Sequence, residues 1–512
     1  MTIAALDLGT TSVKALRVDR AGGAAARRSA ALPLHTGSAG RATQPIEAAW
    51  AAVAGVLAEV AAAPGEPIEA VALSGAMHAL APIDKAGRAM DEAMTWADRR
   101  AADVADRLKA GLEPATLEAM YRRTGCPWSV LYHPARLRWL GGGRHAAATW
   151  ASIKDAVVHR LTGVWATDVS LASATGLLDI HRRRWDAASL ELASTEAEAL
   201  PPLVEPEHIV GRVTPEAAGR TGLAAGTPVV CGASDGALAN LGAGAGVGET
   251  VVTVGTSAAV RRLVVRPAFH PERATWCYIA PGGRWLAGAA MNSGGIAIQR
   301  LLDDAYAGEA DPWATMEAEA GSVAAGAEGA LVLPFVEGER DLVWPHRAGR
   351  RVIGFDEARH GRPHLARATL EGVCYAVATL WAVVHGADAD EARVRPTTAR
   401  LTGGIVRSKL WRQVLADVLG VALLPVEAAD ASALGAGAVG WAALGKEVDW
   451  AAARAWAGPT PPSPPPADGG WVAPNVEPRA AYRASYERWV AACRERGWWL
   501  VERSNRYSER TF

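Results

Sequence analysis

Two short segments of this chain combine glycine with hydroxyl side chains in a form that suits phosphate binding. The first, DLGTTSVK, contains Asp7, Gly9, Thr10, Thr11 and Lys14. Glycine lets the backbone approach a phosphate, exposed amides and hydroxyls can donate to its oxygens, and lysine supplies positive charge. The acid is a candidate ligand of a Mg²⁺ ion, which takes oxygen ligands and keeps several waters. Taken alone, the motif is equally compatible with an ordinary hairpin and an exposed turn.

The second segment, VTVGTSAAVRRLV, repeats this pattern in the middle of the chain. Gly255, Thr256 and Ser257 stand between two apolar, β-rich runs. Each segment is therefore predicted to form a β-hairpin whose turn carries glycine and hydroxyl groups. Two such hairpins that face each other can clamp a polyphosphate from both sides.

A third segment, CGASDGALANLG, places an acid among small residues. Asp235 lies between Ser234 and Gly236, with Gly232 just before them. Such an acid suits a tight turn that faces a cleft, where it can orient a hydroxyl for phosphoryl transfer, a reaction that needs an oriented nucleophile and neutralised phosphate charge. The acid can also cap the helix that follows, and the two interpretations are compatible because a cap position points at open space.

Two further segments offer side chains for a polyhydroxylated acceptor. Its recognition needs planar donors and carboxylates for hydroxyl pairs, and an aromatic or thioether wall against the carbon chain. SGAMHALAPID supplies Met77 and His78, and TWADRRA supplies Trp96, Asp98 and Arg100. Taken alone, His78 is interpreted more simply as a core histidine beside a strand, and WADRRA as a solvated helix start. Their joint occurrence favours the acceptor site.

The elements that must position these residues follow an alternating pattern. Short β-rich runs at 2–8, 13–19 and 69–75 alternate with Ala-rich stretches of helical spacing such as 45–63. This pattern predicts an α/β architecture. The glycines of GAGAVG, from Gly435 to Gly440, do not directly follow a strand, so we interpret them as small residues that let a helix pack closely, and not as a dinucleotide site.

Length and composition limit the classes of function. The chain has 512 residues, half of them hydrophobic, which favours two domains, and the repeated hairpin places their boundary near residue 245, giving domains 1–245 and 246–512. The formal net charge is −1, which does not suggest nucleic acid or an anionic membrane as partner and favours a small molecule.

Cysteine usage and hydropathy bear on the location. The five cysteines are scattered and form no C-x-x-C pair, so they suggest neither a disulfide framework nor a zinc site. The N-terminus has no signal-peptide pattern, and the apolar run GVCYAVATLWAVVHG is shorter than the roughly 18 residues of a membrane span. We expect a cytoplasmic protein that does not span a membrane.

The motifs, in their order along nearly the whole chain, resemble those of the FGGY carbohydrate kinases, a family within the actin, Hsp70 and hexokinase superfamily. They are DLGTTSVKA, TWADRRA, TDVSLASATGLLDIHRRRWD, CGASDGALANLGAG, VTVGTS, LPFVEGER, VIGFDEARHGRPHLARATLEG and LTGGIVRSKLWRQVLADVLG. The resemblance implies two ribonuclease-H-like domains that flank a cleft in which ATP and a sugar meet.

The resemblance also assigns residues. It implies that Asp235 is the catalytic base and, with Asp7, lies at the Mg²⁺ ion, and that Met77, His78, Trp96 and Asp98 contact the substrate, with Arg100 as a further candidate. It places adenosine against Gly403, Gly404 and the helix that starts near Ser408. In GCPWSVLYHPARLRWL the family often has an aromatic or polar substrate contact where this chain has Leu131, and Tyr132 is the adjacent candidate.

These observations predict an ATP-dependent kinase that phosphorylates a terminal primary hydroxyl of a sugar or sugar acid. AMHAL, TWADRRA and YRRTGCP resemble the gluconokinase branch most, which favours gluconate over xylulose or another ketopentose or polyol. A gluconate pocket needs an unpaired cation for the carboxylate, and His78, Arg100 and His133 are the candidates. An ATPase of the actin or Hsp70 type that phosphorylates no sugar is the alternative of another class. A homodimer is compatible with the sequence.

Overall fold

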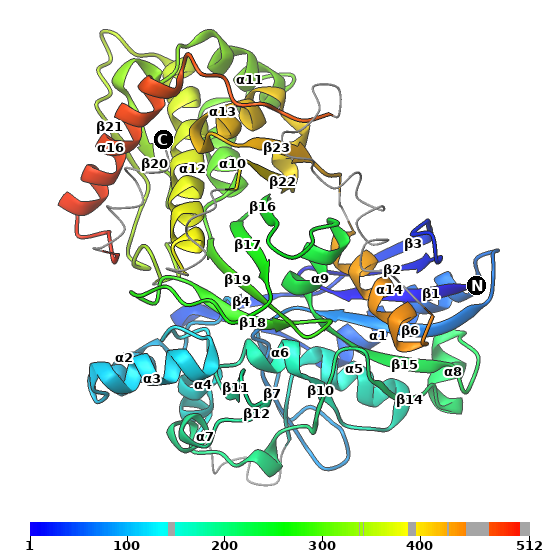
Figure 1. The fold of residues 1–512 in the computed structure, drawn as a ribbon. Coiled ribbons are helices and arrows are strands. Elements are labelled where there is room, and N and C mark those ends of the chain that lie inside the picture. The colour runs from blue at the N-terminus through cyan, green and yellow to red at the C-terminus, as the bar shows by residue number, and fades with distance from the viewer. Residues whose placement is uncertain are drawn as a thin grey trace.

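The chain folds into two lobes, each built around a six-stranded sheet (Figure 1). The computed structural model describes residues 1–141, 149–336, 338–340, 342–387, 396–427, 430–446 and 470–501. The N-terminal half forms the lower lobe of Figure 1, coloured blue to green, and most of the C-terminal half forms the upper lobe. The exception is an orange helix, which lies against the lower lobe.

The first sheet has the strand order β14-β15-β6-β1-β2-β3. The first three strands of the chain form an antiparallel meander, and β6 and β15 continue the sheet parallel to β1. Its strands are β1 (Thr2–Leu8), β2 (Ser12–Val18), β3 (Ala24–Ala31), β6 (Ile68–Gly75), β14 (Ile209–Arg212) and β15 (Pro228–Ser234).

Alternating side chains of this sheet pack into two separate cores. Ala4 and Leu6 point to one face, which is covered by α1 (Ile46–Ala62), α5 (Ile153–Thr162) and α8 (Pro215–Thr221). Ile3 and Ala5 point to the other face, which is covered by α9 (Asp235–Gly242) and α14 (Ala431–Ala443). A sheet that is covered on both faces needs apolar side chains on both, which explains why its strands read as nearly continuous apolar runs.

The second sheet repeats the plan, with the order β18-β19-β17-β16-β22-β23. Antiparallel strands lie on one side of β16, and β22 and β23 continue parallel to it on the other side. Its strands are β16 (Thr250–Val254), β17 (Ala258–Val264), β18 (Trp276–Ala280), β19 (Arg284–Met291), β22 (Thr398–Thr402) and β23 (Ala422–Pro425). The two hairpins predicted from the sequence are thus β1–β2 and β16–β17.

Helices cover one face of the second sheet and form the largest core. Val252, Val254 and Val260 of the sheet pack there against α10 (Gly295–Ala305), α12 (Arg362–His385), α13 (Lys409–Leu419) and α16 (Arg479–Glu495). Within the described chain, α12 is the one helix long and apolar enough to cross a membrane, but 94% of its apolar window is buried inside the protein. The helix is longer than the sequence analysis expected from the apolar run, and it forms part of the core.

The helix α14 brings the C-terminal half back to the first sheet. A Cβ on Gly435 would lie 2.2 Å from the carbonyl oxygen of Leu238 in α9, and one on Gly437 would lie 2.8 Å from the Cβ of Val18 in β2. Only glycine allows such close approach. The glycines of the GAGAVG segment therefore do serve close helix packing, as predicted.

The remaining elements surround the two sheets. In the first half they are β4 (His35–Gly37), β5 (Arg41–Gln44), β7 (Ala81–Ile83), β8 (Ala93–Met94), α2 (Ala102–Ala110), α3 (Pro114–Thr124), α4 (His133–Leu140), β9 (Thr149–Ala151), β10 (Thr167–Asp168), α6 (Val169–Ser173), β11 (Leu178–Asp179), β12 (Arg184–Trp185), α7 (Ala187–Ala193) and β13 (Leu203–Val204). In the second half they are α11 (Pro312–Ser322), β20 (Leu331–Leu333) and β21 (Arg351–Ile353).

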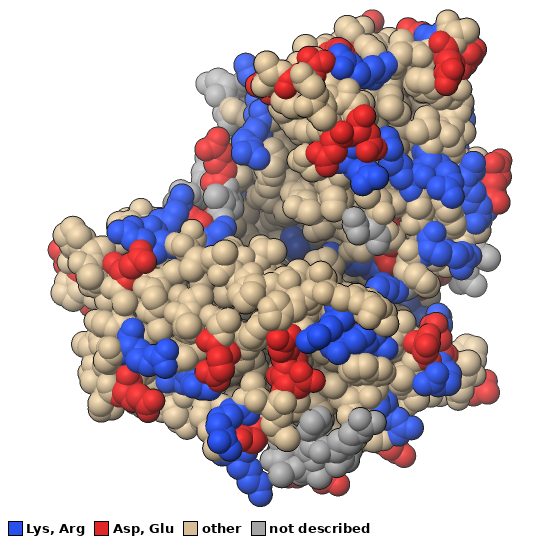
Figure 2. Space-filling model, turned by 180° about the vertical axis from the view of Figure 1, so that it is seen from behind, with Lys and Arg blue, Asp and Glu red and all other residues tan. Residues whose placement is uncertain are grey.

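The α/β class is confirmed, and the predicted elements at 2–8, 13–19, 69–75 and 45–63 are present as β1, β2, β6 and α1. The boundary at residue 245 falls between α9 and β16 and stays a prediction, since α14 returns to the first half. Figure 2 shows acidic and basic side chains interspersed over one face of the molecule, and a hollow between the two lobes.

Candidate active site

Several of the predicted site residues lie at the ends of parallel strands in the two sheets. Asp7, Met77 and Asp235 lie at or just after the C-terminal ends of β1, β6 and β15, and parallel strands end at the same edge of a sheet. In the second sheet, the same edge carries the loops after β16 and β22, which are parallel neighbours. Sheet topology therefore gathers residues from distant parts of the sequence.

The first glycine loop is held by its own half of the chain. Its turn closes with a hydrogen bond of 3.0 Å from the amide of Gly9 to the carbonyl of Ser12. The side chain of Gln44 donates to the Thr10 carbonyl at 2.6 Å, and the indole of Trp96 donates to the Thr10 hydroxyl at 3.1 Å. Thr11 is exposed. Trp96, which was predicted as an acceptor contact, thus holds the first glycine loop.

Asp7 lies beside one hydroxyl and one cation. It accepts a hydrogen bond of 2.8 Å from the Ser74 hydroxyl, and Lys14 is its partner in the β1–β2 register. Burial raises the pKa of Asp7, against the lowering effects of Ser74 and Lys14. Lys14 also lies 3.7 Å from a carboxylate oxygen of Asp430, just before α14.

Asp235 is the first residue of α9, and Ser234 is the N-cap. Its carboxylate accepts a hydrogen bond of 2.7 Å from the adjacent Gly236 amide and does not cap the helix. Burial and the nearby Asp7 raise the pKa of Asp235 to about 6, while Arg261 and Arg340 act in the opposite direction. An acid that titrates so close to neutral pH can accept a proton from an alcohol.

The pair of Asp7 and Asp235 suits a magnesium ion that is shared with a substrate. Among the described residues no group of three or more His, Cys, Asp or Glu side chains forms a metal site. Mg²⁺ is usually held by one or two carboxylates together with waters and phosphate oxygens. Burial is the larger cause of the raised pKa of Asp235, and the negative charge of Asp7 adds to it; a cation bound by these carboxylates would offset that repulsion.

The second glycine loop packs against other glycine backbone. The amide of Gly295 donates to the Gly255 carbonyl at 2.6 Å, and the amide of Gly294 donates to the Thr256 carbonyl at 3.1 Å. Gly403 has φ of +93°, and a Cβ there would lie 2.4 Å from the carbonyl oxygen of Val254. The loops after β16 and β22 therefore form one surface, in which glycine is required.

The residues predicted for the nucleoside lie around this surface, with one difference. Gly403 is exposed and Gly404 is partly exposed after β22. Ser408 is buried, and its hydroxyl accepts from the Trp411 amide as the N-cap of α13 and donates to Glu317 at 2.7 Å. The predicted helix start is confirmed, and the Ser408 hydroxyl is engaged within the protein.

Aromatic rings from both halves pack together around His78, one of the residues predicted to contact the acceptor. The Tyr132 and Tyr278 hydroxyls lie 3.0 Å apart, and the His78 ring packs edge-on against both, with centroid distances of 5.6 and 6.3 Å. Met77 packs against the same cluster. His78 has φ of +67°, a conformation that non-glycine residues adopt mainly where surrounding structure imposes it. Burial, with Arg136 and Arg340, lowers the pKa of His78 to about 3, so its ring is neutral.

Asp98 and Arg100 form an internal ion pair. Asp98 is fully buried, lies 2.7 Å from the Arg100 guanidinium, and accepts from the Ala42 amide at 3.1 Å. Arg136 supports the same turn through bonds to the carbonyls of Asp98 and His78, at 3.2 and 2.7 Å. The geometry therefore holds Asp98 and Arg100 to each other, and Arg136 links their turn to the backbone of His78.

The predicted cations for a carboxylate are therefore wrong. His78 is neutral, burial lowers the pKa of His133 well below its usual value, and Arg100 is paired with Asp98. A neutral imidazole or a paired guanidinium offers no net positive charge to an anion.

Two arginines that the sequence analysis missed face the site from the second half. The Arg340 guanidinium lies over the Trp96 ring, 5.1 Å from its centroid, and its Nε donates to Asn292 at 2.9 Å. Arg261 lies close enough to Asp235 to lower its pKa. Both lie in motifs already quoted, LPFVEGER and VTVGTSAAVRRLV. The signal that could have identified Arg261 is strand alternation, which puts it on the same face as Thr253, two residues before Gly255.

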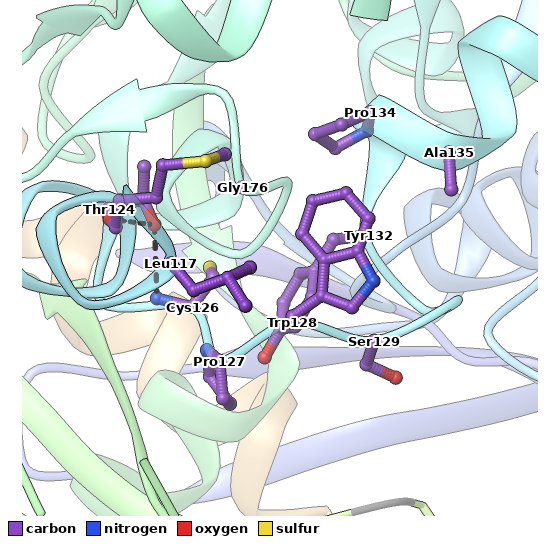
Figure 3. Close-up of a pocket in the computed structure, with 11 residues that line it drawn as sticks. Leu117, Thr124, Cys126, Pro127, Trp128, Ser129, Tyr132, Pro134, Ala135 and Gly176 are labelled. Carbon is purple, nitrogen blue, oxygen red and sulfur yellow. Dashed lines mark hydrogen bonds between the residues drawn. The ribbon is translucent and has the colours of Figure 1, made fainter. Parts of the chain in front are cut away.

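A separate small pocket lies on the segment that precedes α4. Figure 3 shows it lined by Cys126, Trp128, Tyr132 and Pro134, together with Gly176 from a later loop. Among the predicted site residues only Tyr132 lines it. Its lining is largely apolar, so it is a poor fit for a polyol, and the candidate site is the junction around Asp235.

Comparisons with known proteins point to one family. Two models of the FGGY family of carbohydrate kinases match the chain, the N-terminal domain at residues 2–242 and the C-terminal domain at residues 250–444. The gluconokinase of Bacillus subtilis (strain 168) is 31% identical over 456 residues, covering 86% of this chain and 87% of the relative.

Solved structures match over nearly the full length. A gluconate kinase from Lactobacillus acidophilus has a TM-score of 0.86 at 25% identity and covers 99% of both chains. A ligand-bound xylulose kinase from the same organism has a TM-score of 0.87 at 26% identity, over 97% of this chain and 98% of that one. The fold is thus shared with sugar kinases over nearly the whole chain.

Proposed function

Because the chain belongs to the FGGY family of carbohydrate kinases, we propose that it transfers the γ-phosphoryl group of ATP to the terminal primary hydroxyl of a sugar acid, with gluconate as the acceptor. The actin-like and Hsp70-like alternative without an acceptor has no support in this membership. The observation that carries the proposal is the junction of Asp235 with aromatic acceptor residues and two cations.

Asp235 is the proposed base. It lies between the acceptor residues of its own half and Arg261 of the other half, in surroundings that raise its pKa to about 6. The acceptor hydroxyl gives its proton to this carboxylate while the oxygen forms a bond to phosphorus. The bond between the γ-phosphorus and the bridging oxygen breaks, and its electron pair leaves with ADP.

The proposed ATP site uses both hairpin loops. Gly9, Thr10, Thr11 and Lys14 approach the phosphates from the first half, and Gly255, Thr256 and Ser257 approach from the second. Gly403 and Gly404 offer open backbone for the nucleoside, with Ser408 positioning α13 beside it. Asp7 and Asp235 are the proposed carboxylates for Mg²⁺, which when bound neutralises phosphate charge.

The proposed partner of the acceptor carboxylate is Arg340. Its guanidinium extends from the second half over Trp96, near Tyr132 and Tyr278. The neighbouring Glu339 is directed to the backbone amides of Asn292 and Ser293, at 2.8 and 3.2 Å. Arg340 is thus a cation at the acceptor end, and a guanidinium is well suited to a carboxylate.

The location and assembly remain proposals. All five cysteines are buried as free thiols, which supports a reducing, cytoplasmic environment. The chain boundary near residue 245 is the proposed division between an acceptor-binding and a nucleotide-binding domain. A homodimer is compatible with these assignments and can be tested by the mass of the protein in solution.

An assay of ADP release across acceptors tests the function. Gluconate, D-xylulose, L-ribulose and glycerol are compared at matched concentrations, with a reaction lacking acceptor as control. We expect kcat/KM for gluconate to exceed that for D-xylulose by at least about tenfold. Preference for D-xylulose would support the xylulokinase alternative, and ADP release that ignores every acceptor would contradict the proposed kinase activity.

A further inference from the structure

Arg261 is anchored at the strand ends that lead into the two nucleotide loops. It lies on β17, on the same face as Thr253 of β16, and its Nη1 donates to the Thr253 hydroxyl at 3.2 Å. That hydroxyl lies 2.9 Å from the hydroxyl of Thr402, the last residue of β22. The guanidinium is therefore fixed just behind the loops that begin at Gly255 and Gly403.

The same side chain reaches toward the base. A Cβ on Gly236 would lie 3.5 Å from the Arg261 Nε, so the guanidinium stands against the first turn of α9, beside Asp235. Val260 and Ala258 lie on the other face of the same strand, and their side chains point into the helical core of the second half. Arg261 thus extends from the nucleotide loops of one half to Asp235, the proposed base, in the other half.

One polar atom of this arginine is left without a partner. The Arg261 Nε is buried, and no described residue accepts a hydrogen bond from it. A buried donor without an acceptor is costly, and such groups in native proteins need an explanation, for example a ligand that is absent. An anionic oxygen between the loops and Asp235 would satisfy it.

We infer that Arg261 is a further catalytic residue, which contacts the transferred phosphoryl group and stabilises the charge on its oxygens during transfer; this rests on the proposed kinase function. The charge of the moving group is spread over its three outer oxygens, so catalysis depends on cations placed there. Arg261 neither gains nor loses a proton, because the acceptor proton goes to Asp235. The cation of the first hairpin, Lys14, lies close to the carboxylate of Asp430. Arg261 instead donates to the Thr253 hydroxyl, and its Nε has no acceptor among the described residues.

The assignment separates Arg261 from Arg340. Arg340 lies at the acceptor end, so its replacement should alter discrimination between acidic and neutral acceptors. Arg261 lies at the phosphoryl position, so its replacement should slow transfer to every acceptor equally. The two arginines therefore make different predictions for the same assay.

The test compares Arg261→Gln and Arg261→Lys with the control Arg262→Gln. Arg262 is the next residue on the strand, points to the other face, and bonds to the Gly248 carbonyl at 3.4 Å. We expect Arg261→Gln to lower kcat for gluconate and for any neutral acceptor by about 10³-fold, with each KM within about threefold of wild type. The control should keep kcat within about threefold.

A binding measurement provides a readout other than turnover. Calorimetry records the affinity for Mg²⁺ and ADP alone, and then with gluconate and aluminium fluoride, which imitates the phosphoryl group in transfer. For wild type, the affinity for ADP should be much higher with gluconate and aluminium fluoride than without them. Arg261→Gln should lose at least about 100-fold of that gain in affinity, while its affinity for Mg²⁺ and ADP alone stays close to wild type. An unchanged gain, or a fall in ADP affinity that accounts for the whole loss of activity, would overturn the inference.

Arg261→Lys covers the case in which the glutamine variant does not fold. Lysine keeps the charge and the aliphatic stem but not the planar fork, so we expect a loss of roughly tenfold or more in kcat at an unchanged melting temperature. Full kcat in this variant would contradict the contact. If wild type shows no acceptor-dependent ADP release at all, the proposed function fails; if wild type is active and Arg261→Gln matches it, only this inference fails.

Discussion

The two glycine hairpins share a backbone plan but carry different charges at corresponding positions. Asp7 stands two residues before Gly9 in the first hairpin, and Thr253 stands two residues before Gly255 in the second. Each second strand supplies a cation, Lys14 in β2 and Arg261 in β17. The first hairpin therefore pairs a cation with an acid, and the second pairs a cation with a hydroxyl. In the proposed function, the first loop serves the metal side and the second loop serves the phosphoryl side of one triphosphate.

The supports of the two loops differ as well. The first loop is fixed by two side chains of the N-terminal half, Gln44 and Trp96. The second is fixed by backbone bonds from Gly294 and Gly295 and by contact with Gly403. The first loop is thus linked through Trp96 to the residues that we propose for acceptor binding, whereas the second depends on close glycine packing. Substitutions can test each half of this comparison.

The largest effect is expected at the acid between the hairpins. Asp235→Asn removes the proton acceptor while keeping shape and hydrogen bonding, so transfer to gluconate should fall by roughly 10³-fold or more. Calorimetry should show ADP affinity close to wild type. Turnover that survives in this variant would show that Asp235 does not take the proton of the acceptor hydroxyl.

Exchanging the charge pattern of the hairpins tests the comparison itself. Thr253→Asp places a carboxylate where the second hairpin has a hydroxyl, next to the phosphate loop and Arg261, so KM for ATP should rise roughly 100-fold through repulsion. Asp7→Asn should instead raise the Mg²⁺ concentration needed for half-maximal rate by about 10- to 100-fold. Equal responses of the two variants to Mg²⁺ would contradict the proposal that the first hairpin serves the metal and the second serves the phosphoryl group.

Arg340→Gln tests the acceptor end. Loss of the cation should lower kcat/KM for gluconate by about 10- to 100-fold, since a charged hydrogen bond contributes about 1.5 to 3 kcal/mol. A neutral acceptor should be affected by less than about threefold. The ratio of kcat/KM for the two acceptors is the measurement, and a parallel loss for both would argue against recognition of a carboxylate.

The smallest effect concerns stability and the link between the halves. Gly435→Ala would place a Cβ 2.2 Å from the Leu238 carbonyl oxygen, so we expect the free energy of unfolding to fall by about 1 to 3 kcal/mol. Gly55→Ala in α1 is the control, because a Cβ there has open space, and alanine should add about 0.5 to 1 kcal/mol. Denaturant titration compares the two, and equal stability would contradict the close packing of α14 on α9.

The sequence predicted what depends on local pattern. Alternating apolar residues located β1 and β6, helical spacing located α1, and small residues predicted the packing of α14. The repeated hairpin was visible because glycine and hydroxyl residues form a short contiguous motif. These features are set by residues that are neighbours in the chain.

What could not be predicted depends on how the halves approach each other. Arg340 meets Trp96 only because two lobes are in contact, and Arg261 meets Asp235 for the same reason. The cation candidates were wrong because burial, which no motif records, keeps His78 neutral, and because Arg100 has an internal partner in Asp98. The roles of individual site residues stay predictions.

The most direct test is a crystal structure with Mg²⁺, gluconate and a non-hydrolysable ATP analogue. The account predicts the γ-phosphate between the loop at residues 9–11 and the loop at residues 255–257, with the terminal acceptor oxygen within hydrogen-bonding distance of Asp235. A nucleotide that contacts only one of the loops, or an acceptor bound away from Asp235, would contradict it.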